Sequence, residues 1–214
     1  MIPHAVIFDC DGVIVDSEPA TFVLLQQDLA HYGLCLSLQT LEHNYIGGTL
    51  QDVAERATQD GATLPEDWVA AFYAKLYARL AQGTPLIPNV LSVFDRLDAA
   101  QIPYAVGSNG SDQKMRVTLG QHPSLYARLA GRMFSGQNMP NPKPAPDLYL
   151  HAAHALGVAP ALCTVIEDSA TGARAARAAG MRCFGYAPDG NPRLAAEGAI
   201  LFTDMADLPA LLGL

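Results

Sequence analysis

Short apolar runs alternate with helical segments along the chain after residue 83, and this alternation narrows the possible folds more than any other feature. The runs are strand-like and cover residues 104–107, 163–166, 182–185 and 199–202. The intervals carry apolar residues at helical spacing, at 88–100, 111–120, 145–157 and 170–179. Strands separated by helices form βαβ units, because parallel neighbours need a crossover connection. The pattern therefore predicts an α/β fold with a parallel sheet.

A strand-like run at residues 4–9 stands apart from the others, because a long helical stretch follows it. Between residues 15 and 82 the apolar residues keep helical spacing, and no comparable strand-like run interrupts them. We therefore expect two domains. Residues 1–14 and 83–214 would form a doubly wound, Rossmann-like parallel-sheet core, and residues 15–82 an inserted helical-bundle cap domain.

The composition is that of a compact folded chain. Of the 214 residues, 50% are hydrophobic and 16% are charged, which excludes a disordered chain. The formal net charge of -8 disfavours binding to nucleic acid or to acidic membranes. The four cysteines include no C-x-x-C pair, and no apolar run approaches membrane-spanning length. We expect a cytoplasmic protein that binds neither nucleic acid nor membrane, as a monomer or alternatively a dimer.

Two aspartates, Asp9 and Asp11, follow the first strand-like run. They lie in the sequence DCDGV at residues 9–13, where an apolar strand stops and a glycine turn begins. Residues two apart face the same side of an extended chain, so both carboxylates can converge on one pocket. Two such acids favour a bound cation or a shared proton. The alternative is a polar strand end followed by an ordinary turn.

Three further polar sites occur at the expected carboxyl edge of the sheet, where open α/β sheets bind their ligands. Ser108 and Asn109 lie between glycines in an anion-binding turn, or alternatively in a plain turn. Lys143 lies between prolines, which fix the backbone around it, although a surface lysine is the alternative. Glu167 and Asp168 follow a buried-type strand, where helix capping explains one acid and a metal site explains two. Together these groups are the parts of a phosphoryl-transfer site.

In order and spacing, the four sites resemble the motifs of the haloacid dehalogenase-like hydrolase superfamily. The motifs are DCDGV at 9–13, Ser108-Asn109, Lys143-Pro144 and Glu167-Asp168. The chain is similar to the branch with a small helical cap, which includes phosphoglycolate phosphatases, sugar phosphatases and β-phosphoglucomutases. The resemblance implies a Mg²⁺-dependent phosphatase. Such an enzyme hydrolyses a small phosphorylated metabolite, a sugar phosphate or a compound like phosphoglycolate, through an aspartyl-phosphate intermediate.

The resemblance also implies a role for each site residue. Asp9 is the expected nucleophile, and Asp11 is expected to protonate the leaving oxygen and later to take a proton from water. The groups expected to bind phosphate are Ser108, Asn109 and Lys143. The expected Mg²⁺ ligands are Asp9, the backbone carbonyl of Asp11, Asp168, and Glu167 either directly or through water.

Substrate specificity is expected from the inserted helical bundle. Its loop at residues 43–49 includes Gly47 and Thr49, which we expect to contact the substrate, and no Lys or Arg follows until Arg56. Mutases of this branch carry basic groups near that loop, so a phosphatase is favoured over a phosphosugar mutase of the β-phosphoglucomutase type. A non-catalytic binding protein on the same fold is the other alternative. The complete set of motifs argues against it.

Overall fold

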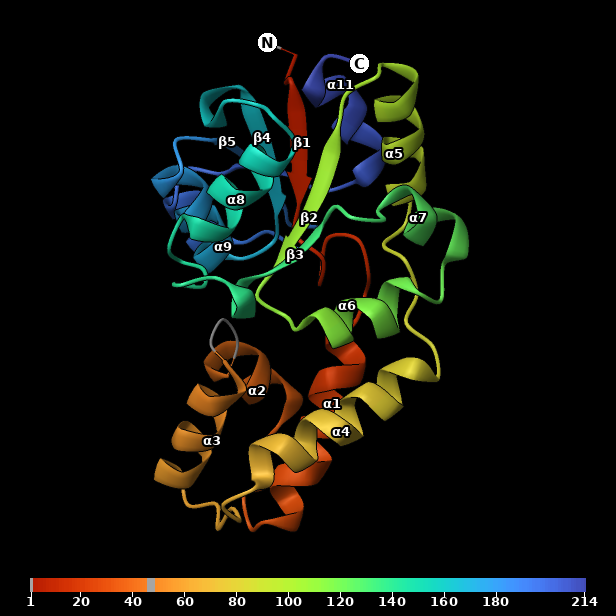
Figure 1. Ribbon diagram of the computed structural model, residues 1–214. Helices are drawn as coiled ribbons and strands as arrows, with labels where there is room; N and C mark the ends of the chain where they lie inside the picture. Colours follow the sequence, from red (N-terminus) through yellow and green to blue (C-terminus); the bar gives the residue numbers. More distant parts are fainter. Residues whose placement is uncertain (1, 46–48) are drawn as a thin grey trace. The chain divides into compact units, whose positions relative to one another are not determined.

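A computed structural model of the chain describes residues 2–45 and 49–214. The chain divides into two compact units, which Figure 1 shows in ribbon form. The core unit is Met1–Asp16 with Pro85–Leu214, and the helical unit is Ser17–Thr84. Within the described residues, no helix combines the length and the apolar character needed to cross a membrane.

A parallel sheet forms the centre of the core unit, with the strand order β3-β2-β1-β4-β5-β6. The first strand is buried at every position, as expected for a central strand covered on both faces. Its neighbours are β2 and β4, in a register that pairs Phe8 with Val106 and with Ile166. The strand order therefore reverses at β1, so the carboxyl ends of these three strands frame the crevice where such sheets bind ligands. The strands are Ala5–Phe8 (β1), Tyr104–Ser108 (β2), Met133–Ser135 (β3), Cys163–Glu167 (β4), Arg182–Tyr186 (β5) and Ile200–Phe202 (β6).

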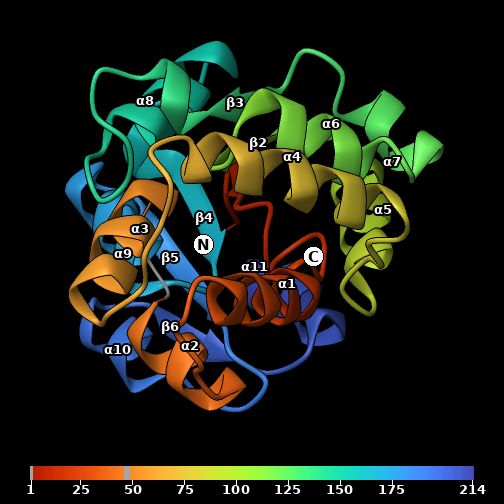
Figure 2. The same ribbon diagram turned by 90° about the horizontal axis from the view of Figure 1, so that it is seen from below.

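Helices cover both faces of the sheet, as the two ribbon views show (Figures 1 and 2). On one face, α5, α6, α7 and α11 bury large side chains, and Phe94 of α5 lies 4.8 Å from Phe8 between ring centroids. On the other face, α8, α9 and α10 pack closely through small residues such as Ala152 and Ala176. The helices are Val90–Ala99 (α5), Asp112–Leu119 (α6), Pro123–Arg128 (α7), Asp147–Ala155 (α8), Ala170–Ala178 (α9), Pro192–Ala196 (α10) and Leu208–Leu212 (α11).

The predicted fold class is confirmed, because every strand-like run in the sequence forms a strand of one parallel sheet. The third strand was not predicted. It has three residues, of which Met133 and Phe134 are only half-buried, and it lies at the edge of the sheet. A short edge strand carries too few apolar residues to stand out from a loop.

The helical unit builds its own core around a buried tryptophan. Trp68 is 1% exposed and stacks on Phe72, with ring centroids 5.2 Å apart. Its indole N–H donates to Asp28 Oδ2 at 2.7 Å, and Lys75 pairs with the same carboxylate. These contacts join α1 to α4. The helices of this unit are Glu18–His31 (α1), Leu38–Asn44 (α2), Leu50–Gln59 (α3) and Trp68–Ala81 (α4).

Candidate active site

The turn after β1 places Asp9 and Asp11 at the carboxyl edge of the sheet. The Asp9 N–H donates to the Ile166 carbonyl at 2.9 Å, which continues the pairing with β4 past the end of the strand. Gly12 then adopts φ +75°, and its N–H closes a tight turn onto the Val15 carbonyl at 2.9 Å. Glycine suits this position because other residues rarely adopt a positive φ. The side chains of Asp9 and Asp11 keep 11% and 21% of their surface exposed, so a substrate can reach both.

Lys143 lies against the Asp9 carboxylate. Its Nζ is 2.5 Å from Asp9 Oδ1 and 2.8 Å from Glu167 Oε1, and its side chain is only 3% exposed. The loop that carries it is fixed by Asn109, whose amide donates to the Lys143 carbonyl at 3.1 Å and accepts from the Lys143 N–H at 3.0 Å. The predicted sites after β2 and before α8 therefore come together. The ammonium also lies 4.6 Å from the centroid of the Tyr149 ring, which favours its charge.

Glu167 is fully buried, and both of its carboxylate oxygens are engaged. Oε1 accepts from Lys143 Nζ and from the Tyr149 hydroxyl, each at 2.8 Å. Oε2 accepts from the Asp168 N–H at 3.0 Å and from the Ser169 N–H and hydroxyl at 2.8 Å. Burial alone would raise the pKa of Glu167, but Lys143 and the hydrogen bonds from Ser169 lower it below its usual value. Glu167 is therefore a buried anion that holds Lys143, and the contacts do not favour direct ligation of a cation.

The remaining acids supply the donors that a hard cation needs. Burial, together with the charges of Glu167 and Asp11, raises the pKa of Asp9 to about 7 although Lys143 opposes the rise. A nearby cation would favour the ionised Asp9. Asp168 lies over the turn after β1, because a Cβ placed on Gly12 would be 2.0 Å from its Oδ2.

The donor set fits Mg²⁺, which binds one or two protein carboxylates and keeps several waters. Among the described residues, no three His, Cys, Asp or Glu side chains form a metal-binding group. A cation at this edge would therefore be held by the carboxylates of Asp9 and Asp168 with the Asp11 backbone carbonyl. It would not be enclosed by a cage of side chains.

Ser108 ends β2 beside the second aspartate. Its side chain is buried, and its hydroxyl accepts from the Gly110 N–H at 2.9 Å and lies 3.5 Å from Asp11 Oδ2. The loop is further fixed by Ser135 of β3, whose hydroxyl donates to the Gly110 carbonyl at 2.7 Å. A rigid loop with a buried hydroxyl suits the binding of phosphoryl oxygens.

The sequence analysis did not single out Lys114 or Tyr149, which contact the acids of the site. Lys114 Nζ lies 2.9 Å from Asp11 Oδ1. Burial opposes the charge of Lys114, but Asp11 with Cys10 and Asp9 raises the pKa of Lys114 above its usual value, so the ammonium persists. Tyr149 is fully buried on α8 and follows the apolar spacing of a core residue, so nothing in the sequence marks its hydroxyl. For Lys114 a signal did exist, namely a lysine in the first turn of the helix after Ser108.

Gly47 and Thr49, the two residues that we expect to contact the substrate, belong to the helical unit. Gly47 lies outside the described residues. Thr49 caps α3, because its hydroxyl accepts from the Asp52 N–H at 3.2 Å while Asp52 Oδ2 accepts from the Thr49 N–H at 2.6 Å. This capping box accounts for Thr49 locally. A role for Thr49 in substrate binding stays a prediction.

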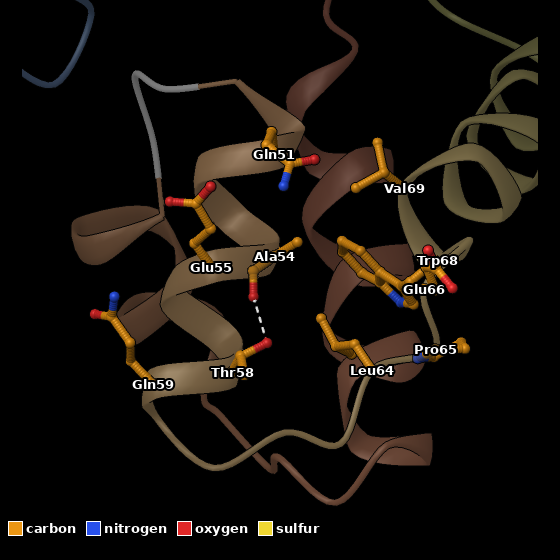
Figure 3. Close-up of a pocket in the computed structure, with 10 residues that line it drawn as sticks. All are labelled: Gln51, Ala54, Glu55, Thr58, Gln59, Leu64, Pro65, Glu66, Trp68 and Val69. Carbon is orange, nitrogen blue, oxygen red and sulfur yellow. Dashed lines mark hydrogen bonds between the residues drawn. The ribbon is translucent and has the colours of Figure 1, made fainter.

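The helical unit also contains a hollow of about 390 Å³ between α3 and the start of α4 (Figure 3). One wall is α3, in which the Thr58 hydroxyl donates to the Ala54 carbonyl at 2.8 Å. Among the described residues that line the hollow, Glu55 and Glu66 are acidic and none is basic. A phosphate would meet like charge there, so this hollow is not the candidate site.

Comparisons with known proteins identify the family of the chain. The family model of haloacid dehalogenase-like hydrolases matches residues 3–180. The 6-phosphogluconate phosphatase of Escherichia coli (strain K12) is 30% identical over 213 residues, which cover 97% of this chain and 94% of that protein. A crystal structure of a hydrolase of the same family from Deinococcus radiodurans R1, with bound phosphate and sodium, has a TM-score of 0.79 and 33% identity. The superposition covers 98% of this chain and 95% of the Deinococcus protein. A haloacid dehalogenase-like protein from Agrobacterium tumefaciens has a TM-score of 0.86 and 29% identity, with 98% and 97% covered.

Proposed function

Because the chain belongs to the haloacid dehalogenase-like hydrolases, we propose that it is a phosphatase that uses Asp9 to hydrolyse a small phosphorylated metabolite. The observation that carries the proposal is the position of Asp9. It is the partly exposed carboxylate at the end of the central strand, and it lies 2.5 Å from Lys143, with Asp11 in the turn that follows and Ser108 at the end of β2. The 6-phosphogluconate phosphatase relative supports a sugar phosphate or phosphorylated sugar acid as the substrate class.

In the first step, an Asp9 carboxylate oxygen attacks the phosphorus atom, and the bond from phosphorus to the leaving oxygen breaks. Asp11 gives its proton to that oxygen, so the product leaves as a neutral alcohol. Lys143 and Ser108 hold the phosphoryl oxygens, and the lysine, whose side chain is only 3% exposed, balances their charge. Asp9 is left as an aspartyl-phosphate, and Asp11 is left as a carboxylate.

In the second step, Asp11 takes a proton from a water molecule, which attacks the aspartyl-phosphate and releases inorganic phosphate. Asp9 and Asp11 thereby return to their starting states. Mg²⁺, when bound by Asp9, Asp168 and the Asp11 carbonyl, supplies positive charge that reduces repulsion between the nucleophile and the phosphate. Glu167 serves in both steps by holding Lys143 in place.

The test is phosphate release from a panel of sugar phosphates, phosphorylated sugar acids, phosphoglycolate and nucleotides, with Mg²⁺ and with EDTA. We expect release from one or a few alkyl phosphates in Mg²⁺ and none in EDTA. Asp9→Asn should lower kcat by at least about 10³-fold, because an amide cannot form the acyl phosphate.

Asp95→Asn is the matched control, since Asp95 is an exposed aspartate on α5 that pairs with Arg128. It should keep the wild-type rate. Release that persists in Asp9→Asn would exclude the nucleophile, and release that persists in EDTA would exclude the metal. A requirement for a catalytic amount of a bisphosphate, with isomerisation in place of phosphate release, would assign a mutase.

A further inference from the structure

Lys114 forms an ion pair with the proposed acid and base of the site. Its Nζ lies 2.9 Å from Asp11 Oδ1, and the two side chains are only 17% and 21% exposed. The lysine belongs to α6, in the core unit, and follows the helix cap Ser111 by three positions. The Ser111 hydroxyl accepts from the Lys114 N–H at 3.0 Å, so the backbone of Lys114 is fixed at the start of the helix.

Local helix physics does not explain a lysine at this position. The start of a helix carries partial positive charge, so a cation in the first turn is unfavourable there. The third position after a capping serine is where an acidic or amide side chain would complete a capping box. A largely buried ammonium adds a further desolvation cost. The ion pair with Asp11, which is remote in the sequence, is the contact that offsets these costs.

The ion pair belongs to a crowded arrangement over Gly110. A Cβ placed on Gly110 would lie 3.1 Å from Ser108 Oγ, 3.3 Å from Lys114 Cδ and 3.5 Å from Asp11 Oδ2. The hydroxyl, the lysine stem and the carboxylate therefore converge on the one residue of this loop that has no side chain. The two oxygens of Asp11 face different partners, with Oδ1 at Lys114 and Oδ2 at 3.5 Å from the Ser108 hydroxyl.

We propose that Lys114 is a positioning residue that donates to Oδ1 of Asp11, so that Oδ2, the oxygen beside Ser108, carries the proton to the leaving oxygen. The inference rests on the proposed function and adds a residue to it. Lys114 acts through Asp11 and does not bind the substrate. Its removal should therefore weaken the proton transfer and leave the nucleophile, the phosphate ligands and the fold intact.

The choice of leaving group tests this inference. An alkyl phosphate needs a proton on its leaving oxygen, whereas p-nitrophenolate departs as a stable anion. The quantity to measure is kcat/KM, because it reports the steps up to departure of the leaving group. Lys114→Met should lower kcat/KM about 10- to 100-fold for the best alkyl phosphate of the panel, which is part of a typical general-acid contribution. For p-nitrophenyl phosphate the loss should stay below about 3-fold.

Three variants control the experiment. Asp11→Asn should show the same dependence on the leaving group, and Lys114→Met should add no further loss in that background, because the two residues act as one unit. Lys114→Arg keeps a cation and should recover part of the activity. Arg116→Met removes an exposed basic residue of the same helix and should leave both substrates unaffected. Thermal unfolding of each variant checks the fold.

The outcomes separate the inference from the proposed function. Equal losses of kcat/KM for both substrates would overturn the inference, since Lys114 would then bind phosphate or support the fold. Unchanged activity on both substrates, or an additive loss in the Asp11→Asn background, would overturn it as well. A folded wild-type protein that hydrolyses neither substrate would refute the proposed function, and this inference with it.

Discussion

Gly172 shows how closely the site depends on single residues. It lies in the first turn of α9, and a Cβ placed on it would be 1.6 Å from Glu167 Oε1 and 1.9 Å from the Glu167 carboxyl carbon. The Glu167 carboxylate therefore occupies the space that any side chain at position 172 would fill. Because Glu167 also holds Lys143, a change at Gly172 reaches the lysine that we propose to act in catalysis through one intermediate residue.

We predict that Gly172→Ala lowers both stability and activity. Alanine in a helix normally gains up to about 1 kcal/mol over glycine. Overpacking against a buried carboxylate costs about 1 to 3 kcal/mol, so the net change should be destabilising. Urea unfolding and phosphate release measure the two effects. Gly107→Ala is the comparison, because its Cβ would lie 3.3 Å from Leu148 Cγ and 3.4 Å from a ring carbon of Tyr149, which is close contact without overlap and should cost less. A more stable Gly172→Ala variant would show that Glu167 has room to move.

The sequence analysis singled out the candidate site residues whose setting depends on local pattern. Asp9 and Asp11 follow a buried strand, and Lys143 lies between prolines, so each has a recognisable setting in the chain. Tyr149 has no such setting, and the setting of Lys114 in the first turn of a helix does not name its partner, because the contacts of both residues are with residues remote in the sequence. Spacing on one helix cannot reveal which partner a side chain meets across the sheet.

At the scale of elements, the short elements at the edge of the fold are harder to predict from the sequence than the central strands. The strand-like runs at 104–107 and 163–166 are buried on both faces, and they form the strands that flank β1. The third strand and α7 are short, and partly buried side chains weaken their patterns. Burial produces the apolar pattern that sequence reasoning uses, so the centre of the sheet is easier to predict than its rim.

Helices α9 and α10 are joined by charges at the end of α10. Arg174 Nη2 lies 2.5 Å from Glu197 Oε1, and Arg177 Nη2 lies 2.8 Å from Glu197 Oε2. The hydrogen bond from Arg174, together with the charges of both arginines, lowers the pKa of Glu197. One carboxylate thus holds two arginines of the neighbouring helix. Such a network contributes more than an isolated surface pair.

The lowered pKa of Glu197 sets the sign of a pH effect. The folded state favours the ionised form of Glu197 more than the unfolded state does. The contacts between Glu197 and the two arginines therefore stabilise the fold at pH values above 4.5, the ordinary pKa of a glutamate. That contribution is lost as pH falls through the lower folded pKa. Calorimetry should find a lower Tm for Glu197→Gln than for the wild type at pH 7, and the difference should shrink as the pH falls below 4.5.

A double-mutant cycle provides the control for this effect. Arg174→Gln should cost less in the Glu197→Gln background than in the wild type, because its partner is already absent. Additive losses, or a Tm difference that persists unchanged in acid, would show that the contacts at Glu197 are not the source of the stabilisation.

At the scale of the whole molecule, the chain leaves and re-enters the core unit at one point. The Asp16 N–H donates to the Pro85 carbonyl at 2.9 Å, Val15 pairs antiparallel with Leu86, and the Ile87 N–H donates to the Ile14 carbonyl at 2.9 Å. The two ends of the core sequence thus already form a short antiparallel pair. The residues proposed to act in catalysis all lie in the core segments, although β1 is separated in the sequence from every other strand.

This pairing predicts that the core unit folds without residues 17–84. A two-residue Asn-Gly linker closes antiparallel chains in a tight turn, so it should connect Asp16 to Pro85 without straining the pair. We expect the shortened protein to unfold cooperatively and to keep the β1 amides protected from hydrogen exchange, because β1 is the central strand of the sheet. A second variant that also lacks residues 15, 16, 85 and 86 removes the antiparallel pair and should be less stable. A shortened chain with no cooperative transition, or with unprotected β1 amides, would show that residues 17–84 are needed to hold β1 in the sheet.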